Sequence, residues 1–363
     1  MKLSTVLFYL VVITFTLNSC NQRAEEIKEE VINWDTTKIS YPFYMASSEA
    51  MGIKSTFNFL SSGDAMLLYY YSIRADSFYV YDVTNKASLL SSHPFNVEDS
   101  TKAIVRGITP ISTDSIFILC DADIYLYDLQ RGKAVFHKRI PEEYSLLSHF
   151  TTPVYNKKEN AFYTELIQWN VPKSKNGVFN SKMLAKINLK TGFTKFLDLK
   201  VNEEMTLKAN QYYFSPFKDR LYYGYSHSDS IYVSDKNKLN FKSMPAKTPI
   251  GLDNNISSQK PERIDRMREE NTYNTYFGEL FSNKEHLYRI QYLPLPGRNE
   301  EGLVPGLSEK SFVILEYDED LNLKRVLKPE PKIFLLAYFS FHQDQLYALS
   351  HSPGSITIYR LKF

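Results

Sequence analysis

The sequence predicts an all-β protein, a six-bladed β-propeller built of four-stranded antiparallel blades. The chain has 363 residues, of which 43% are hydrophobic and 23% are charged, as is typical of a globular protein with a large core. Tyrosine (27) and phenylalanine (24) are abundant, whereas glycine (13) and proline (16) are sparse, and this composition suits half-buried strands. A pattern of two aromatic-rich runs joined by a turn also recurs along most of the chain.

The first 19 residues read as a targeting segment. Lys2 is followed by an apolar run over residues 3–17, which is too short to cross a bilayer that needs about 20 apolar residues. The run ends in Leu-Asn-Ser-Cys at residues 17–20, which resembles the site at which bacterial lipoproteins are cleaved and acylated. We therefore expect residues 1–19 to be a lipoprotein signal peptide and Cys20 to be lipidated. The alternative is an ordinary secretory signal with a chance cysteine.

The residues that follow Cys20 indicate where the protein resides. Residues 20–30 are polar and charged, so we expect a lipidated cysteine and a tether. Several acyl chains, at about 0.8 kcal/mol per buried methylene, anchor a protein stably. Asn21 stands where the usual inner-membrane retention signal has aspartate. We expect an outer-membrane lipoprotein of the cell envelope, facing the periplasm or the surface, with the membrane as partner through the lipid anchor.

Residues 31–363 are expected to form the propeller as one domain. Four strands per unit, repeated about every 45 to 60 residues, are typical of blades, and about four to eight blades close a ring. Second strands are predicted at residues 66–73, 115–120, 161–167, 220–226, 286–293 and 345–350. Third strands are predicted at residues 77–83, 123–129, 182–189, 230–235, 311–318 and 355–361. An apolar run that would form the first strand precedes each pair of second and third strands. A run that would form the fourth strand follows five of the six pairs.

The sixth unit ends after its third strand, which predicts how the ring closes. A bare strand edge would expose unpaired backbone groups. We therefore expect an N-terminal strand within residues 31–43 to pair with the C-terminal strand. One short rim helix is expected over residues 261–270, because Ser258 can cap it and charges spaced four residues apart support a solvated face.

The long insertions are expected on one face of the propeller. Turns between first and second strands are short, whereas the insertions at residues 168–181, 245–274 and 293–310 fall between second and third strands or between blades. In a propeller, connections of these two kinds lie at the face opposite the short turns. Loops carry most binding and catalytic residues, so this loop-rich face is predicted to meet a ligand or partner. The alternative is that the insertions plug the channel or cap a blade.

Seven side chains are candidates for this binding face: Trp169, His227, Asp229, Arg263, Arg266, Arg298 and His351. The tryptophan could stack on a sugar or an aromatic ligand, or it could hold its own loop in place. The histidines and the aspartate offer imidazole and carboxylate groups, but they also suit polar loops, and no metal site is predicted. The arginines could bind an anion or form an ordinary charged surface.

Arg289 is unusual because it interrupts an apolar strand that should be packed on both faces. A buried charge needs a partner, and Glu279 on the preceding strand is the natural candidate. The sequence therefore predicts a Glu279–Arg289 ion pair at the central channel, either structural or facing a channel ligand.

The sequence motifs of several classes of chemistry are absent. No phosphate-binding glycine loop, nucleophile elbow, HExxH, EF-hand loop or CxxC motif occurs, so no catalytic residue and no cofactor are predicted. Basic residues number 43 against 41 acidic ones and are interspersed, so nucleic acid is not expected as a partner. Cys120 ends an apolar run and is expected to be a small core residue.

These features together resemble a family of uncharacterised Bacteroidetes lipoproteins, each with a six-bladed propeller domain of unknown function. The resemblance rests on the lipobox at residues 17–20, the tyrosine-rich strand pairs, the helix at residues 261–270 and the segment 276–294 with its Leu287-Tyr288-Arg289 core. It covers essentially the whole mature chain. It implies the propeller fold and a lipid anchor, but no activity.

Three hypotheses for function follow from these observations. The first is a non-enzymatic binding propeller, anchored in the envelope, that presents its loop-rich face to a glycan, peptide or protein. The second is a polysaccharide hydrolase or lyase with acids at the channel mouth. The third is a structural subunit of an envelope complex that uses the rim helix.

Overall fold

The computed structural model describes residues 27–40, 56–73, 75–84, 86–95, 105–120, 123–140, 144–146, 153–168, 182–191, 194–198, 212–226, 228–235, 238–249, 274–295, 310–330, 337–352 and 355–362. Within these ranges the chain forms β-strands and no helix. The described residues contain no helical segment long and apolar enough to span a membrane.

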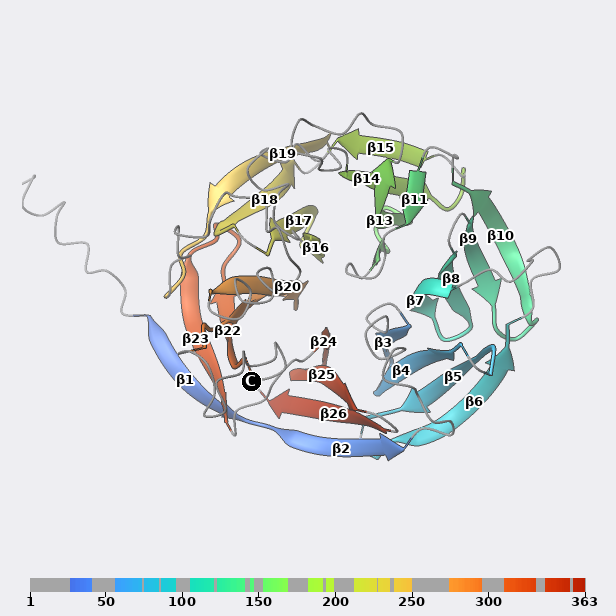
Figure 1. Cartoon of the computed structure of the whole chain (residues 1–363), viewed down its shortest axis with the longest axis horizontal. Helices are drawn as coiled ribbons and strands as arrows, with labels where there is room; N and C mark the ends of the chain where they lie inside the picture. The colour runs from blue at the N-terminus through green and yellow to red at the C-terminus, as the bar shows by residue number, and fades with distance from the viewer. Residues whose placement is uncertain are drawn as a thin grey trace, which may run out of the picture.

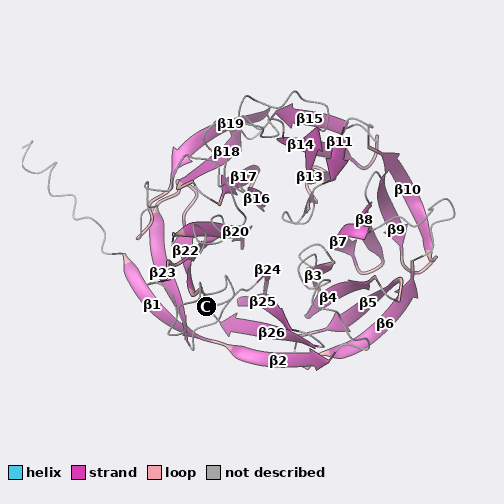
Figure 2. Cartoon of the chain, in the orientation of Figure 1, coloured by secondary structure: helices cyan, strands magenta, loops and turns pink. Residues whose placement is uncertain are grey.

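The strands form six sheets around a central axis, which confirms the predicted propeller (Figures 1 and 2). The first strand of each blade lies nearest the axis and the fourth lies outside. Blade 1 contains β3 (Phe57–Ser62), β4 (Ala65–Ser72), β5 (Ser77–Asp82) and β6 (Ser88–Pro94), and blade 2 contains β7 (Val105–Ser112), β8 (Ser115–Cys120), β9 (Asp123–Asp128) and β10 (Lys133–Arg139). Blade 3 contains β11 (Tyr144–Leu146), β12 (Val154–Asn156), β13 (Ala161–Gln168), β14 (Lys182–Asn188) and β15 (Thr194–Asp198).

The other three blades repeat this arrangement, and two of them include N-terminal strands. Blade 4 contains β16 (Tyr212–Phe217), β17 (Arg220–Tyr225), β18 (Ser230–Asp235) and β19 (Lys238–Pro245). Blade 5 contains β20 (Tyr276–Ser282), β21 (Leu287–Tyr292), β22 (Phe312–Tyr317), β23 (Leu323–Glu330) and β1 (Lys28–Asn33). Blade 6 contains β24 (Ala337–His342), β25 (Gln345–Ser352), β26 (Ser355–Lys362) and β2 (Asp35–Ser40).

The N-terminal segment closes the ring as expected. Strand β2 pairs antiparallel with β26 along its whole length and becomes the fourth strand of blade 6. Strand β1 continues onto blade 5, where it pairs in parallel with β23. It begins at Lys28, inside the segment expected as tether, because backbone pairing with β23 orders even these polar residues. Ion pairs from Glu29 to Lys328 (2.5 Å) and from Glu30 to Arg325 (3.3 Å) reinforce this edge.

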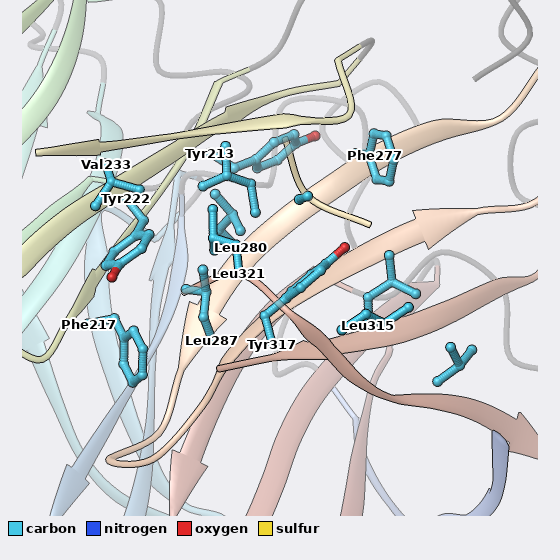
Figure 3. Packing of buried hydrophobic residues seen from close by; sticks show 14 of the residues in the cluster. Tyr213, Phe217, Tyr222, Val233, Phe277, Leu280, Leu287, Leu315, Tyr317 and Leu321 are labelled. Carbon is cyan, nitrogen blue, oxygen red and sulfur yellow. The ribbon is translucent and has the colours of Figure 1, made fainter. Parts of the chain in front are cut away.

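The core lies between the blades rather than at the axis. Six clusters of buried apolar residues each draw on two adjacent blades, so every interface between neighbours has its own core. Figure 3 shows the cluster between blades 4 and 5, where Tyr213 and Phe217 of blade 4 meet Phe277 and Leu280 of blade 5. Buried tyrosines fill these interfaces because one side chain supplies apolar area and a polar tip. Cys120 is buried between blades 1 and 2, as expected.

The turns that join first to second strands are short and lie at one end of the blades. Several contain a residue with positive φ, which lets two residues reverse the chain; Gly63 (57°), Lys218 (52°) and Gln343 (52°) are examples. The opposite ends of the blades lead into the long insertions. Those insertions and the expected rim helix lie outside the described residues, apart from their flanks.

Candidate functional site

The inner strands of all six blades line a cavity of about 460 Å³ at the centre of the ring. Its lining includes Ser61, Pro216 and Ser282, close to the short turns, and Lys157, an exposed residue of such a turn. The cavity therefore reaches the surface at the short-turn face. Ligand pockets commonly have about 300 to 1,000 Å³, so this space suits a small organic molecule.

Aromatic side chains make up about a third of the described lining, which carries few charges. The aromatic members come from five blades and are Phe59, Tyr155, Tyr213, Phe214, Phe281, Tyr338, Phe339 and Phe341. Among the described lining residues, Glu279 is the acidic side chain and Lys157 is the basic one. The interior thus presents ring faces, hydroxyl groups and one carboxylate.

Polar side chains of the lining connect neighbouring blades by donating hydrogen bonds to backbone carbonyls. Asn58 Nδ2 of blade 1 donates to the carbonyl of Ile108 in blade 2 at 3.0 Å. Thr109 Oγ1 of blade 2 donates to the carbonyl of Pro153 in blade 3 at 3.1 Å. These bonds fix the inner strands relative to one another, and they use the hydroxyl proton of Thr109 and one of the two amide protons of Asn58.

The same arrangement continues around the ring. Ser282 Oγ of blade 5 donates to the carbonyl of Pro216 in blade 4 at 2.7 Å, and Ser215 Oγ donates to Ser282 Oγ at 3.2 Å. Within blade 3, the hydroxyl of Tyr155 donates to Asn160 Oδ1 at 2.8 Å. Such hydroxyl groups keep lone pairs that can accept, but their protons are already engaged.

Ser61 and His342 form the corresponding contact between blades 1 and 6. Ser61 Oγ lies 2.9 Å from His342 Nδ1; the serine is exposed at the cavity mouth and the histidine is buried. A serine beside an imidazole can serve as a nucleophile only if another group orients the ring. His342 Nε2 has no hydrogen-bond partner among the described residues, so this pair reads as a structural contact.

A β-bulge directs Glu279 into the cavity. Strand β20 pairs with β21 in register at Phe277 and again at Leu280, so that Gly278 and Glu279 together face one residue of β21. Gly278 packs so tightly that an added Cβ would lie 2.7 Å from Tyr292 Cε2. Bulges bend a strand and redirect a side chain, which is why they are common beside functional sites.

The neighbouring inner strand β24 has a bulge at the equivalent place. Its register shifts between Ala337 and Ser340, and Tyr338 has a φ of 57°, an uncommon conformation for a bulky residue. Phe339 lines the cavity and stacks on Phe281 of blade 5 at 4.8 Å between ring centroids. Blades 5 and 6 thus present an aromatic wall beside Glu279.

Glu279 also contributes to the raised pKa values of three neighbouring tyrosines, for which burial is the largest cause. Burial raises the pKa of Tyr213, Tyr276 and Tyr292, and the carboxylate of Glu279 raises each pKa further. The positive charge of Arg289 lowers the pKa of Tyr213 and so offsets part of this rise. The phenols therefore stay neutral over the physiological range.

Arg289 has partners other than the expected one. Its side chain is buried, and Nη2 donates to the carbonyls of Tyr225 (2.8 Å) and Ser228 (2.7 Å) in blade 4. Nη1 reaches the carbonyl of Asp229 at 3.4 Å, and the guanidinium carbon lies 3.7 Å from the centre of the Phe277 ring. The ion pairs of the described residues do not join it to Glu279. The β17–β18 connection satisfies this cation instead, and burial lowers the pKa of Arg289 to about 10.

Lys310 is a second buried cation near the same wall. Its Nζ donates to the carbonyl of Asn274 and lies 4.8 Å from the centre of the Tyr276 ring. The residue is fully buried, and burial lowers the pKa of Lys310 to about 7. It joins the starts of β20 and β22, next to the strand that carries Glu279.

Of the seven candidates for the loop-rich face, the structure places two. Asp229 is exposed in the β17–β18 connection, where its carbonyl meets Arg289. His351 lies in β25 opposite Ile356 of β26. Trp169, His227, Arg263, Arg266 and Arg298 lie outside the described residues, as does Cys20. In the described part of the chain, no group of three or more histidine, cysteine, aspartate or glutamate side chains could hold a metal ion.

The ring of six blades and its axial cavity define the class of protein: a β-propeller with a lined central channel. The chain belongs to the family described as a domain of unknown function, DUF4221, which matches residues 31–325. A solved member of that family from Bacteroides vulgatus is 14% identical, with a TM-score of 0.64 over 90% of this chain and 96% of that chain. At this identity the likeness shows the fold alone.

Two further structures are similar at a lower level. One is a putative exported protein from Bacteroides fragilis, 10% identical with a TM-score of 0.48, covering 93% of this chain and all (100%) of that chain. The other is the calcium-binding protein regucalcin from Agrobacterium tumefaciens, 10% identical with a TM-score of 0.49, covering 92% and 96%. No curated protein matches the chain.

Proposed function

We propose that this protein is a non-enzymatic binding propeller that holds a small molecule in its axial cavity. The observation that supports this is the cavity of about 460 Å³, to which all six inner strands contribute. Its aromatic side chains with a few placed polar groups have the composition of a ligand pocket rather than of a packed core. The two bulges on β20 and β24 shape its wall.

We further propose that the propeller is attached to the bacterial outer membrane by a lipid on Cys20. The support is the sequence of residues 1–20, in which a short apolar run ends in a lipobox-like cysteine. Metabolic labelling with a radioactive fatty acid tests the anchor. Label in the wild-type chain that is lost in Cys20→Ala is the expected result, and equal labelling of both would refute it.

A cavity-filling variant tests the binding function. Ser340 lines the cavity, and Ser340→Trp would occupy the space, whereas Ser88→Trp places the same side chain on the exposed start of β6. Compounds from a small-molecule library should raise the melting temperature of the wild-type chain and of Ser88→Trp, because a ligand stabilises the state it binds. They should not do so for Ser340→Trp. Equal stabilisation of all three would place the site elsewhere, and no stabilising compound would refute the function.

The described lining does not favour a polysaccharide hydrolase. Glycoside cleavage uses two carboxyl groups about 5 to 9.5 Å apart, and Glu279 is the carboxylate that the described lining supplies. A partner glycan, peptide or protein on the loop-rich face, or a structural role in an envelope complex, concerns insertions beyond the described residues. Reciprocal pull-down from detergent-solubilised envelope tests those roles.

A further inference from the structure

The outer strand of blade 1 carries an exposed pair of leucines. In β6, which lies at the rim of the ring (Figure 1), Leu89 is 53% exposed and Leu90 is 56% exposed. The register between β5 and β6 shifts at this point, so that Leu90 is the extra residue of a β-bulge. Single exposed leucines are common on protein surfaces, but adjacent ones on a sheet edge favour association with another chain.

The same strand has none of the charges that the other outer strands carry. Each of the other five blades ends in a strand with at least one lysine, namely Lys28 in β1, Lys38 in β2, Lys133 in β10, Lys195 in β15 and Lys242 in β19. Charges on an edge strand, lysine above all, prevent one sheet edge from pairing with another. Strand β6 contains no lysine, arginine, aspartate or glutamate. Among the described blades, it is therefore the outer edge that lacks this electrostatic protection.

The sequence around the leucines is complementary to a second copy of itself. Residues 88–91 read Ser-Leu-Leu-Ser, which is the same in both directions. Two antiparallel copies with a two-fold axis between Leu89 and Leu90 would place leucine against leucine and serine against serine. A two-fold interface requires such a self-complementary surface. The lysine-bearing edges would instead bring like charges together, which disfavours pairing.

A contact centred on these leucines would stop at two copies. The bulge at Leu90 interrupts a continuous ladder of backbone hydrogen bonds, and Pro94 at the end of β6 has no backbone N–H to donate. The leucine side chains, rather than a long ladder, would therefore hold the copies together. Because a two-fold contact uses the β6 edge of both partners, neither partner keeps this edge for a third copy.

We propose that β6 is an interface through which two copies of this chain associate, with Leu89 and Leu90 of each copy in contact across a two-fold axis. Removal of the leucines from water drives the association. The interface is independent of the proposed ligand binding and of the proposed anchor. Because β6 lies at the rim, the pair leaves the short-turn face, with the mouth of the cavity, and the loop-rich face accessible.

Site-specific cross-linking in intact cells tests the pairing. Two differently tagged copies of the full chain carry Ser88→Cys, at an exposed position beside the leucines, and a membrane-permeant bismaleimide joins cysteines that lie close together. Cys120 is buried and should not react, and the same chains without Ser88→Cys give the background from Cys20. We expect a product above background that contains both tags. Absence of that product, or a product that joins β6 to a different protein instead, would overturn the inference.

Two lysine variants in this background assign the cross-link to the leucines. Leu90→Lys gives β6 the charge that the other edges carry, so it should lower the yield of the product about tenfold or more. Val135→Lys is the matched control, because Val135 is 48% exposed and is the extra residue of the equivalent bulge in β10. Its yield should be unchanged. Equal yields in the two variants would show that the copies meet by chance collision and would contradict the inference. If Leu90→Lys does not fold, Leu89→Ser makes a smaller change to the same contact and should lower the yield several-fold.

Discussion

The two halves of the channel wall are built differently. In blades 1 to 3 the inner strands are joined by neutral hydrogen bonds, as from Asn58 to Ile108 and from Thr109 to Pro153. In blades 4 to 6 Glu279 lines the cavity, and the buried cations Arg289 and Lys310 lie behind the wall. Irregular pairing does not distinguish the two halves, because β7 has register shifts as β20 and β24 do, whereas β3 and β16 pair regularly. The difference between the halves is therefore one of buried charge.

Proteins place irregular backbone and buried charges where function requires them and stabilise them locally. Arg289 is held by carbonyls of blade 4, and Gly278 allows Tyr292 to pack against the bulge. We therefore expect substitutions to have larger effects in blades 4 to 6 than in blades 1 to 3.

The largest effect is expected for Arg289→Met. This change removes the donor that satisfies the carbonyls of Tyr225 and Ser228 and leaves them buried. We expect a loss of about 3 kcal/mol or more in the free energy of unfolding, because hydrogen bonds to a charged group contribute about 1.5 to 3 kcal/mol each. Urea denaturation measures it. Arg131→Met, at an exposed turn, is the control, and equal stabilities would show that Arg289 does not join the two blades.

A smaller effect is expected for Gly278→Ala. The new Cβ would lie 2.7 Å from Tyr292, so the bulge must shift at a cost of about 1 to 3 kcal/mol, as for other overpacked sites. Gly63→Ala in the neutral half meets no atom within 4 Å and bears only the strain of its positive φ, about 1 kcal/mol. The comparison fails if Gly63→Ala proves the more damaging change in thermal denaturation.

A neutral hydrogen bond between two blades should contribute less to the free energy of unfolding than the contacts of Arg289. Thr109→Val keeps the shape but leaves the Pro153 carbonyl without its donor, which should cost about 1 to 2 kcal/mol. Chemical denaturation of this variant beside Arg289→Met ranks the two halves directly. A loss for Thr109→Val as large as that for Arg289→Met would contradict the division of the wall.

Lys310 makes the stability of the folded protein depend on pH. Below pH 7 the lysine is protonated in both states, and the full cost of burying its charge is present. Between its folded pKa of about 7 and pH 10, the unfolded lysine, with a pKa near 10.5, holds a proton that the folded one has lost, so stability rises with pH. Urea midpoints at pH 7 and pH 9 should show this rise in the wild-type chain and not in Lys310→Met. The same rise in both chains would assign it to other groups.

The sequence predicted the parts of the fold that repeat. Aromatic-rich strand pairs recur six times with short turns, and a missing fourth strand indicated closure by residues 31–43, where β2 lies. The start of β1 at Lys28 was not predicted, because its pairing with β23 depends on backbone groups and not on apolar periodicity.

The site was harder to predict because it depends on departures from the repeat. The segment 276–282 reads as an ordinary strand, and alternation along it does not show that Gly278 and Glu279 form a bulge. Arg289 was recognised as a buried charge in need of partners, but carbonyls of a connection 61 residues earlier in the chain supply them, as with Ser228. A glycine next to the single acid of an aromatic strand is the signal that could have located the bulge.

The axial cavity, with the bulged strands β20 and β24 in its wall, is proposed above as a site for a small molecule. A crystal structure of the full chain soaked with small bromine-labelled aromatic compounds tests this proposal, because the bromine gives an anomalous signal at a defined position. We expect a bromine peak inside the axial cavity of the wild-type chain for at least one compound and none there in Ser340→Trp. Bromine only at sites outside the channel, or the same cavity peak in Ser340→Trp, would contradict the proposal.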